Sequence, residues 1–343
     1  MASLTIALDA NGSDHGPGEV ARGAALAVAA DPDLRVLLFG PAGEMDAADR
    51  VEIVDAPLSV AKAADPVAAV REQPDASIVQ AVQAVADDRA DALVSGGSTA
   101  AALAAGVFRI KRARGVHRPA LALLLPVPSR PFLLLDAGAN VDVRPEHLVQ
   151  FAHMGAAFAQ AVLGIETPRV ALLSNGTEAT KGTDAVLAAH EKLLGMPGFA
   201  GNVEGFTVAS GDADVVVTDG FTGNVMLKTM EGTMQALLEA IRAAAMSSPR
   251  SKAGGLLLRP ALGGLRDELD PELQGGAVLL GLRKLGVVPH GSFTARGIAT
   301  AVAVAARGVR HDLVGRTHAA LEAAGALRRA PVASGAEARV DSS

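Results

Sequence analysis

The chain has 343 residues, enough for one large domain or two medium ones, and half of them are hydrophobic although aromatic residues make up only 3%. It contains no cysteine, which excludes disulfides, thiolate metal sites and a cysteine acyl-enzyme. The net charge of −6 and the scarcity of aromatic rings argue against nucleic-acid binding, because that needs a basic surface and stacking platforms.

No targeting or membrane-spanning segment is expected. Residues 1–6 lack the basic region of a secretory signal and lead directly into an apolar run. The longest aliphatic run, residues 121–125, is far too short to cross a bilayer. We therefore expect a cytosolic protein.

One unit recurs along the chain: an aliphatic run, a polar loop that contains glycine, and a helical pattern. The runs predict strands at 4–8, 34–39, 51–54, 92–94, 120–125, 131–135, 170–173, 215–217 and 285–288. The helical patterns fall at 18–30, 66–71, 77–88, 100–108, 145–163, 225–246 and 294–306, with one more ending near 194. This alternation predicts an α/β fold of three layers (α/β/α) with a mainly parallel sheet, in a single domain over residues 1–329.

Two segments depart from this unit. Residues 247–276 contain three prolines and two glycine pairs, and we interpret them as an insertion that is functional or covered by a partner. Residues 330–343 are small and polar and are expected to form a loose tail. The loops that follow successive strands should gather at one edge of the sheet, where ligands bind in open α/β sheets.

The stretch ADVVVTDGFTGNVMLK (213–228) holds the most informative of these loops. After a buried strand, a turn leads into a helix and carries Asp219, Gly220, Thr222, Gly223 and Asn224. Its two glycines allow a close backbone approach, and free N–H groups at a helix start attract anions. The alternative is that Asp219 and Thr222 only cap the helix.

The loop SGGST (95–99) is the best candidate for a phosphate cradle. Its glycines let the backbone approach a ligand, and its hydroxyl groups stand beside a helix N-terminus. The candidate residues are Ser95, Gly97, Ser98 and Thr99. The loop is neither a Walker A motif nor a dinucleotide fingerprint, so no nucleotide cofactor is indicated. The alternative is a plain turn with Ser98 as the helix N-cap.

The first loop, residues 9–17, offers Asp9, Gly12, Asp14 and His15. These side chains could form an acid–base pair or bind a metal, but their spacing matches no recognised metal signature, so no metal is expected. The more common role of such an aspartate is to cap the following helix.

Later loops add further candidate binding residues. Asn140 lies in DAGANVD (136–142), where an Asx turn is the simpler interpretation. The loop NGT supplies Asn175, Gly176 and Thr177.

Two lysines and a histidine complete the set. Lys181 is either a counter-charge for an anion or a surface lysine, whereas Lys228 is interpreted as a solvated surface residue. His290 precedes Gly-Ser at the end of a strand and is either a ligand contact or a satisfied loop residue.

Together these loops resemble one family, the bacterial phosphate acyltransferases of phospholipid synthesis, which convert acyl-acyl carrier protein and orthophosphate to acyl phosphate. The matching stretches run in family order from residue 4 to about 308. They include IALDA (6–10), SGGST (95–99), LLLDAGANVDVRPEHLVQFAHMG (133–155), PRVALLSNGTEATKG (168–182), ADVVVTDGFTGNVMLKTMEG (213–232), GGAVLLGL and HGS. Two loops depart from the family pattern: residues 11–13 read Asn-Gly-Ser instead of Met-Gly-Gly, and Ser98 stands in place of an asparagine.

The resemblance implies a fold like isocitrate and isopropylmalate dehydrogenases, a homodimer, and no required metal or nucleotide. It also implies acyl carrier protein and inorganic phosphate as substrates, transient contact with the inner face of the cell membrane, and a downstream glycerol-phosphate acyltransferase. On that basis Leu256, Leu257 and Leu258 form an amphipathic tip that meets lipid or an acyl chain, or else part of a dimer interface.

The expected reaction places phosphate beside a thioester carbonyl, so positioning and oxyanion stabilisation can supply most of the catalysis. In this hypothesis the N–H groups of residues 95–99 and 175–177 hold one phosphate, with Lys181 as its counter-charge. Asn224 or His15 polarises the carbonyl, and Asp219 orients one of them. The alternatives are a phosphate acetyltransferase-like enzyme that uses acyl-CoA, and a non-catalytic scaffold that binds carrier protein at the membrane.

Overall fold

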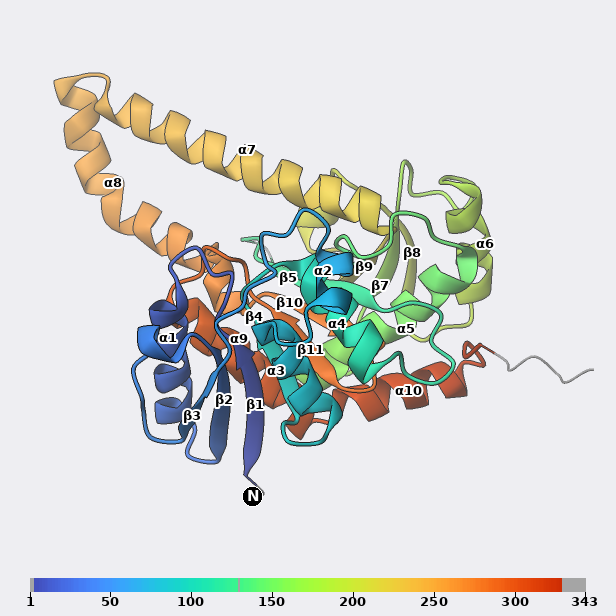
Figure 1. Cartoon of the computed structure of the whole chain (residues 1–343). Helices are drawn as coiled ribbons and strands as arrows, with labels where there is room; N and C mark the ends of the chain where they lie inside the picture. Colours follow the sequence, from blue (N-terminus) through green and yellow to red (C-terminus); the bar gives the residue numbers. More distant parts are fainter. Residues whose placement is uncertain (1–2, 129, 329–343) are drawn as a thin grey trace, which may run out of the picture.

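A computed structural model describes residues 3–128 and 130–328 of the chain (Figure 1). One sheet of 11 strands runs through this part, in the order β3-β2-β1-β4-β11-β10-β5-β6-β9-β7-β8. The strands are β1 Leu4–Asp9, β2 Leu34–Gly40, β3 Val51–Asp55, β4 Ala92–Ser95, β5 Ala120–Leu125, β6 Phe132–Leu135, β7 Val170–Ser174, β8 Phe199–Glu204, β9 Val215–Val217, β10 Ala277–Leu280 and β11 Leu285–Val288. The tail expected at 330–343 lies outside the described residues.

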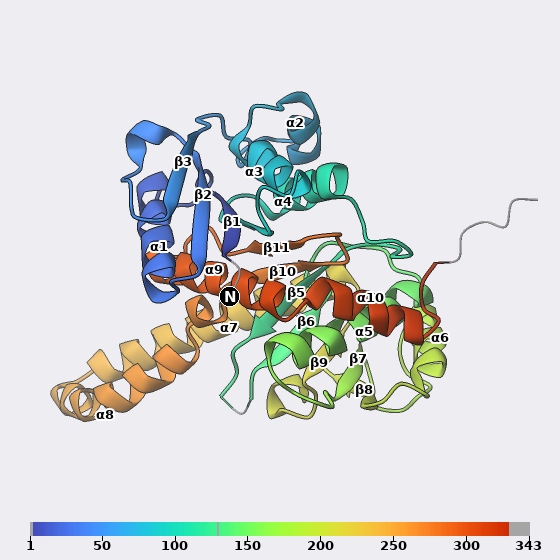
Figure 2. The ribbon, with the colours of Figure 1, turned by 90° about the horizontal axis from the view of Figure 1, so that it is seen from below.

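Helices cover both faces of this sheet, which confirms the α/β prediction (Figures 1 and 2). They are α1 Pro17–Ala30, α2 Pro66–Glu72, α3 Ser77–Ala86, α4 Thr99–Ala105, α5 Pro145–Val162, α6 Asp184–Leu193, α7 Gly220–Met246, α8 Pro249–Glu268, α9 Ala295–Arg310 and α10 Leu313–Ala323. Side chains alternate between two cores along each strand, so that Ile6 and Leu8 of β1 pack with α1 and α9 on one face. Ala7 packs with α3 and α4 on the other face.

Small residues let these layers lie close together in a chain with few aromatic side chains. At Gly23 of α1, a Cβ atom would lie 2.6 Å from the Cβ of Ile298 in α9. Gly155 of α5 approaches Val215 of the sheet in the same way, at 2.5 Å. Closely packed aliphatic side chains therefore fill the core of this protein, whereas aromatic side chains fill part of the core in other proteins.

Three of the ten strand pairings are antiparallel, namely β11 with β10, β10 with β5, and β5 with β6. They reverse the strand direction, so that β1, β4 and β11 run one way while β6, β9 and β7 run the other. The expectation that all polar loops gather at one edge is therefore wrong. The loops instead form two separate groups.

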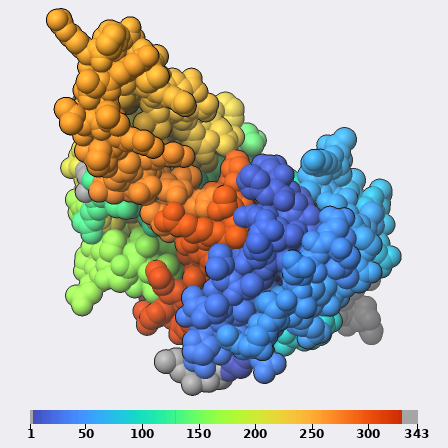
Figure 3. All heavy atoms as spheres, turned by 90° about the vertical axis from the view of Figure 1, so that its left-hand side faces the viewer, coloured from blue at the N-terminus to red at the C-terminus, as the bar shows by residue number. Residues whose placement is uncertain are grey.

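Residues 247–276, which we interpreted as an insertion, belong mostly to the second helix of a pair of long helices. Residues 249–268 form α8, which starts with Pro249 behind the N-cap Ser248, and packs beside α7. The pair projects from the body of the molecule as a helical hairpin (Figures 1 and 3). Leu257 at this projection is 82% exposed. Among the described helices, none has both the length and the apolar character that crossing a bilayer requires.

A few elements differ from the sequence expectations. Strands β8 and β10 and helix α10 were not expected. The helix expected over 100–108 ends at Ala105 and continues as a π-helical turn, η2 Gly106–Ile110. No aspartate side chain caps α1, because its N-cap is Gly16, so the capping role expected in the first loop is wrong.

Candidate active site

Two groups of loops surround the candidate site. The first loop group follows the adjacent parallel strands β1, β4 and β11 and comprises residues 9–16, 95–99 and 289–292. The second loop group follows β6, β7 and β9 and comprises residues 136–142, 174–182 and 218–224. Within each group, the strand ends are neighbours in the sheet, so the loops contact one another.

Backbone contacts join the members of the first loop group. The N–H of Asp14 donates to the carbonyl of Gly291 at 2.8 Å. A Cβ atom at Gly12, whose φ is +94°, would lie 2.7 Å from the Cα of Gly97. These two glycines are thus required where one loop crosses the other, and their close approach is to a neighbouring loop.

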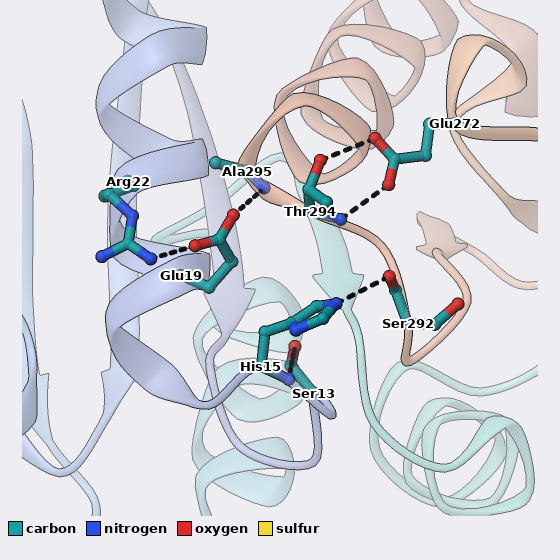
Figure 4. Close-up of polar contacts among 8 residues, drawn as sticks. All are labelled: Ser13, His15, Glu19, Arg22, Glu272, Ser292, Thr294 and Ala295. Carbon is teal, nitrogen blue, oxygen red and sulfur yellow. Dashed lines mark hydrogen bonds and ion pairs between the residues drawn. The ribbon is translucent and has the colours of Figure 1, made fainter. Parts of the chain in front are cut away.

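His15 fixes the position of the third loop in this group (Figure 4). Its Nε2 lies 3.1 Å from the carbonyl oxygen of Ser292. A carbonyl can only accept, so Nε2 carries the hydrogen. His15 therefore positions residues 290–292, and its other ring nitrogen is an acceptor in the neutral form.

Two carboxylates hold the start of α9 beside this loop, as Figure 4 shows. Glu272, in the short helix η4 Pro271–Gln274 that follows α8, accepts from the backbone N–H and the hydroxyl of Thr294 at 2.8 and 2.7 Å. Glu19 of α1 accepts from the N–H of Ala295 at 2.6 Å and pairs with Arg22. The bond from Ala295, and then the bond from Arg22, hold the pKa of Glu19 below its ordinary value. A helix N-terminus stabilises a nearby carboxylate in general, because the positive end of the helix dipole favours the negative charge.

Asp9 lies beneath the first loop group rather than on its surface. Its side chain is 2% exposed and accepts from the hydroxyls of Ser77 at 2.6 Å and Ser95 at 2.8 Å, and from the N–H of Asn11 at 3.2 Å. Burial raises its pKa to about 6, although these three hydrogen bonds favour the charged form. Asp9 therefore contacts the first loop group from beneath, through Asn11 and Ser95.

Ser98 and Thr99 occupy the start of α4. The Ser98 hydroxyl accepts from the N–H of Ala101 at 3.4 Å, so its alternative role as N-cap is confirmed. Thr99 follows as the first residue of the helix.

In the second loop group, a buried carboxylate organises residues 136–140. One oxygen of Asp136 accepts from the N–H groups of Leu121, Gly138 and Ala139 at 3.0 to 3.1 Å. The other oxygen accepts from the backbone and the side-chain amide of Asn140, both at 2.7 Å. The Asx-turn interpretation is confirmed, and Asn140 serves this turn.

The stretch 218–224 begins α7 next to that turn. Asp219 caps the helix by accepting from the N–H of Thr222 at 2.8 Å and from its hydroxyl at 2.7 Å, which confirms the capping alternative. Gly220 and Gly223 face residues 136–140, and a Cβ at Gly223 would lie 2.0 Å from the carbonyl oxygen of Asp136. The glycines let α7 start directly against the neighbouring loop.

Asn175, Thr177 and Lys181 are exposed at the end of β7. Gly176 lies against the Lys181 side chain, where a Cβ would come within 2.6 Å of its Cγ. β7 is six strand spacings from β4 in the sheet, or about 29 Å at ~4.8 Å per spacing. The structure therefore does not bring residues 175–177 to residues 95–99, and one phosphate cannot be held by both loops of this chain.

A cavity of about 480 Å³ lies between the two loop groups, beneath the first turns of α7. Its walls are mainly apolar and come from the sheet, from α7 and from the segment after α8; they include Leu121, Leu123, Leu125, Leu227, Met230, Met234, Leu269, Val288 and Phe293. Its polar wall residues include Thr99, Asn224, Lys228, His290 and Ser292. Both loop groups thus reach one cavity, with Thr99 and His290 from the first and Asn224 from the second.

The hydrogen bonds of His290 determine which ring nitrogen can donate into this cavity. Its Nδ1 accepts from the N–H of Ser292 at 3.3 Å and lies 2.7 Å from the Ser292 hydroxyl. In the neutral ring the hydrogen is therefore on Nε2. His290 can donate one hydrogen bond to an oxygen bound in the cavity.

Lys228 is exposed, as expected of a surface lysine, and its side chain also lines this cavity. Among the described residues of the cavity wall, it is the only lysine or arginine, and its Nζ lies 2.7 Å from Glu231. The signal in the sequence is its spacing, because residues i and i+4 share a helix face and Lys228 follows Asn224 by four. No residue of 174–182 lines the cavity, so Lys181 does not share it.

The fold is similar to phosphotransacylases of known structure. A phosphotransacetylase from Streptococcus pyogenes aligns with a TM-score of 0.60 and 18% identity over 90% of this chain and 94% of its own. A branched-chain phosphotransacylase from Enterococcus faecalis gives 0.57 and 18%, over 90% of this chain and 99% of its own. In fold class, the chain is therefore an α/β protein of the phosphotransacylase kind.

Its sequence relatives are more specific. A family model described as "Fatty acid synthesis protein" matches residues 4–316. A phosphate acyltransferase of Heliobacterium modesticaldum is 43% identical over 91% of this chain and 96% of its own length, and one of Levilactobacillus brevis is 44% identical over 86% and 89%. The chain belongs to the phosphate acyltransferase family, as its loops indicated, and is an acyltransferase.

Proposed function

We propose that this acyltransferase makes acyl phosphate from a long-chain acyl-acyl carrier protein and orthophosphate, for membrane phospholipid synthesis. The single observation that carries the proposal is the cavity beneath α7, which combines a long apolar wall with a small polar one. An apolar wall of leucine and methionine suits an acyl chain, and a few polar groups suit its reacting end. Family membership supports the same chemistry.

In the proposed reaction, a phosphate oxygen attacks the thioester carbonyl carbon. The carbon–oxygen bond to phosphate forms, the carbon–sulfur bond breaks, and the carrier thiolate leaves and takes up a proton. Orthophosphate is already anionic near neutral pH, so the site needs no strong base. Placing the reactants together and stabilising the oxyanion supply the rate enhancement.

Three residues of the polar wall suit these tasks. The Nε2–H of His290 and the side-chain amide of Asn224 are donors for the developing oxyanion. Lys228 is the counter-charge for phosphate, a role that we expected of Lys181, and Glu231 holds it in place when no anion is bound. His15 positions residues 290–292, and Asp219 positions the first turn of α7.

We also propose how the protein works in the cell. Residues 1–329 form one catalytic domain with a fold like isocitrate and isopropylmalate dehydrogenases, and two chains form a homodimer. The exposed Leu256, Leu257 and Leu258 suit transient contact with the inner face of the cell membrane, where a downstream glycerol-phosphate acyltransferase takes the product. The rest of the protein is cytoplasmic.

The test is turnover of purified protein with a long-chain acyl-acyl carrier protein and orthophosphate, with acyl phosphate trapped as the hydroxamate. We expect product only when phosphate is present. The fold similarity to phosphotransacetylases supports a second candidate, an enzyme that uses acyl-CoA. Product from acetyl-CoA but not from the carrier-bound donor would favour that candidate, and carrier binding without turnover of either donor would favour a scaffold.

A further inference from the structure

The segment RIKRARGVHR (109–118), between η2 and β5, carries an uncompensated positive charge. Its five cationic side chains are all exposed, and no acidic residue lies among them; they are Arg109, Lys111, Arg112, Arg114 and Arg118. None of the five forms an ion pair with another described residue. In a chain with a net charge of −6, such a cluster marks a surface for an anionic partner.

The segment borders a groove of about 870 Å³, which we call the basic groove. Its apolar floor includes Val107, Val116 and Leu327, and its cationic rim is Lys111, Arg112, Arg114 and Arg328. Glu322 also lines it. An apolar floor between charged rims is the form that binds an amphipathic helix, with the floor supplying affinity and the rim supplying charge specificity.

The basic groove is a preformed feature. The side-chain amide of Gln150 donates to the carbonyls of Gly115 and Ala326 at 3.0 and 2.7 Å, and its oxygen accepts from the N–H of His117 at 2.8 Å. The N–H of Arg328 donates to the carbonyl of Gly115 at 2.7 Å. These bonds hold the two segments that form the floor, so a partner need not order them.

The basic groove also lies within reach of the cavity beneath α7. Val116, which lines the groove, precedes by five residues Leu121, which lines that cavity, so their Cα atoms are at most about 18 Å apart. The side-chain amide of Asn140 donates to the carbonyl of Pro119 at 2.8 Å and joins the second loop group to this segment. A partner in the groove would need a flexible arm of about this length to place a group in the cavity.

We propose that the basic groove docks an acidic helix of the acyl carrier protein while its acyl group enters the cavity; this rests on the proposed function, in which the donor is carrier-bound. The charge of the rim selects for an acidic partner. The chain's own residues 329–343 contain two arginines, one glutamate and one aspartate, so their net charge is zero and they do not complement the rim. Nucleic-acid binding by base stacking would need aromatic platforms, and aromatic residues make up only 3% of this chain.

The test compares two double variants with the same change in charge. Lys111→Glu with Arg114→Glu reverses the rim, whereas Arg35→Glu with Arg307→Glu changes exposed residues of β2 and α9 that do not line the groove. We expect the rim variant to raise the KM for a long-chain acyl-acyl carrier protein by at least about tenfold, with kcat at saturation and turnover of acyl-CoA within about twofold of wild type. High salt should raise the wild-type KM and leave that of the rim variant nearly unchanged.

Equal KM values for the rim variant and the control would overturn the proposal. Calorimetric titration with the carrier protein alone separates it from the proposed function, because carrier binding that depends on the rim can be seen even if no acyl phosphate forms. If wild type turns over the carrier-bound donor and the rim variant does so equally well, only the docking proposal fails. Removal of residues 330–343 is expected to leave carrier affinity unchanged, and a rise of about tenfold would show that the tail occupies the groove instead.

Discussion

Replacing Asp9 with asparagine should make the protein more stable above pH 6 while it impairs the first loop group. The pKa of the Asp9 carboxyl is about 6 in the folded protein, whereas its ordinary value is 3.8. Between these two pH values the native state keeps the carboxyl proton that the unfolded chain has lost. The stability that the neutral form contributes is therefore fully present below pH 3.8 and is lost as the pH rises through 6. Since one unit of pKa shift corresponds to 1.36 kcal/mol, the charged form of Asp9 lowers the free energy of unfolding by about 3 kcal/mol above pH 6.

The assay is urea unfolding of wild type and Asp9→Asn, followed by circular dichroism at pH 5 and at pH 7.5. Over this interval the wild type should lose about 1.4 kcal/mol more than the variant, as the linkage relation gives for pKa values near 6 and 4. Ser95→Ala is the matched comparison, because it keeps the carboxylate but removes a bond that favours its charged form. In Ser95→Ala, the loss of stability should occur at a higher pH than in wild type. If the free energies of unfolding of wild type and Asp9→Asn change in parallel with pH, the reasoning is refuted.

Three further predictions concern the cavity and the hairpin. Lys228→Ala should raise the KM for phosphate on the order of tenfold, because a charge-assisted hydrogen bond is lost. Lys181→Ala should leave this KM nearly unchanged. If steady-state kinetics give the opposite ranking, Lys181 is the counter-charge for phosphate. Met230→Trp should fill part of the cavity and lower kcat/KM for long acyl donors by about tenfold relative to short ones, so uniform loss across a chain-length series would contradict an acyl cavity. Leu257→Ser should weaken sedimentation with anionic vesicles without changing turnover of soluble donor, and unchanged sedimentation would argue for a dimer interface instead.

The sequence pattern was sufficient for most elements but not for their directions. Apolar runs such as residues 120–125 and 132–135 indicate strands because both faces are buried. The same burial hides which way each strand runs. The short connection 126–131 makes β5 and β6 antiparallel neighbours, but nothing in the pattern places β10 beside β5, so the full reversal was not predicted. Strand β8 contains glycine and asparagine at its centre, so it gives no distinct strand pattern.

The candidate site was predictable loop by loop rather than as an assembly. Thr99, Asn224 and His290 line the cavity, as their places at strand ends suggested. The glycines were harder to interpret, because a glycine that approaches a neighbouring loop, such as Gly223, looks the same in sequence as one that approaches a ligand. Distances across the sheet decide such questions, and a single sequence does not contain them.

Helix α7 has a mechanical consequence. Its first turns carry Asn224, Lys228 and Met234 on the cavity wall, and the same helix continues without a proline to Met246 at the far end of the projection. Its 27 residues make a rod of about 40 Å. A stiff rod transmits a tilt at one end to the other, so a tilt of the projecting hairpin would also move the cavity wall that α7 carries.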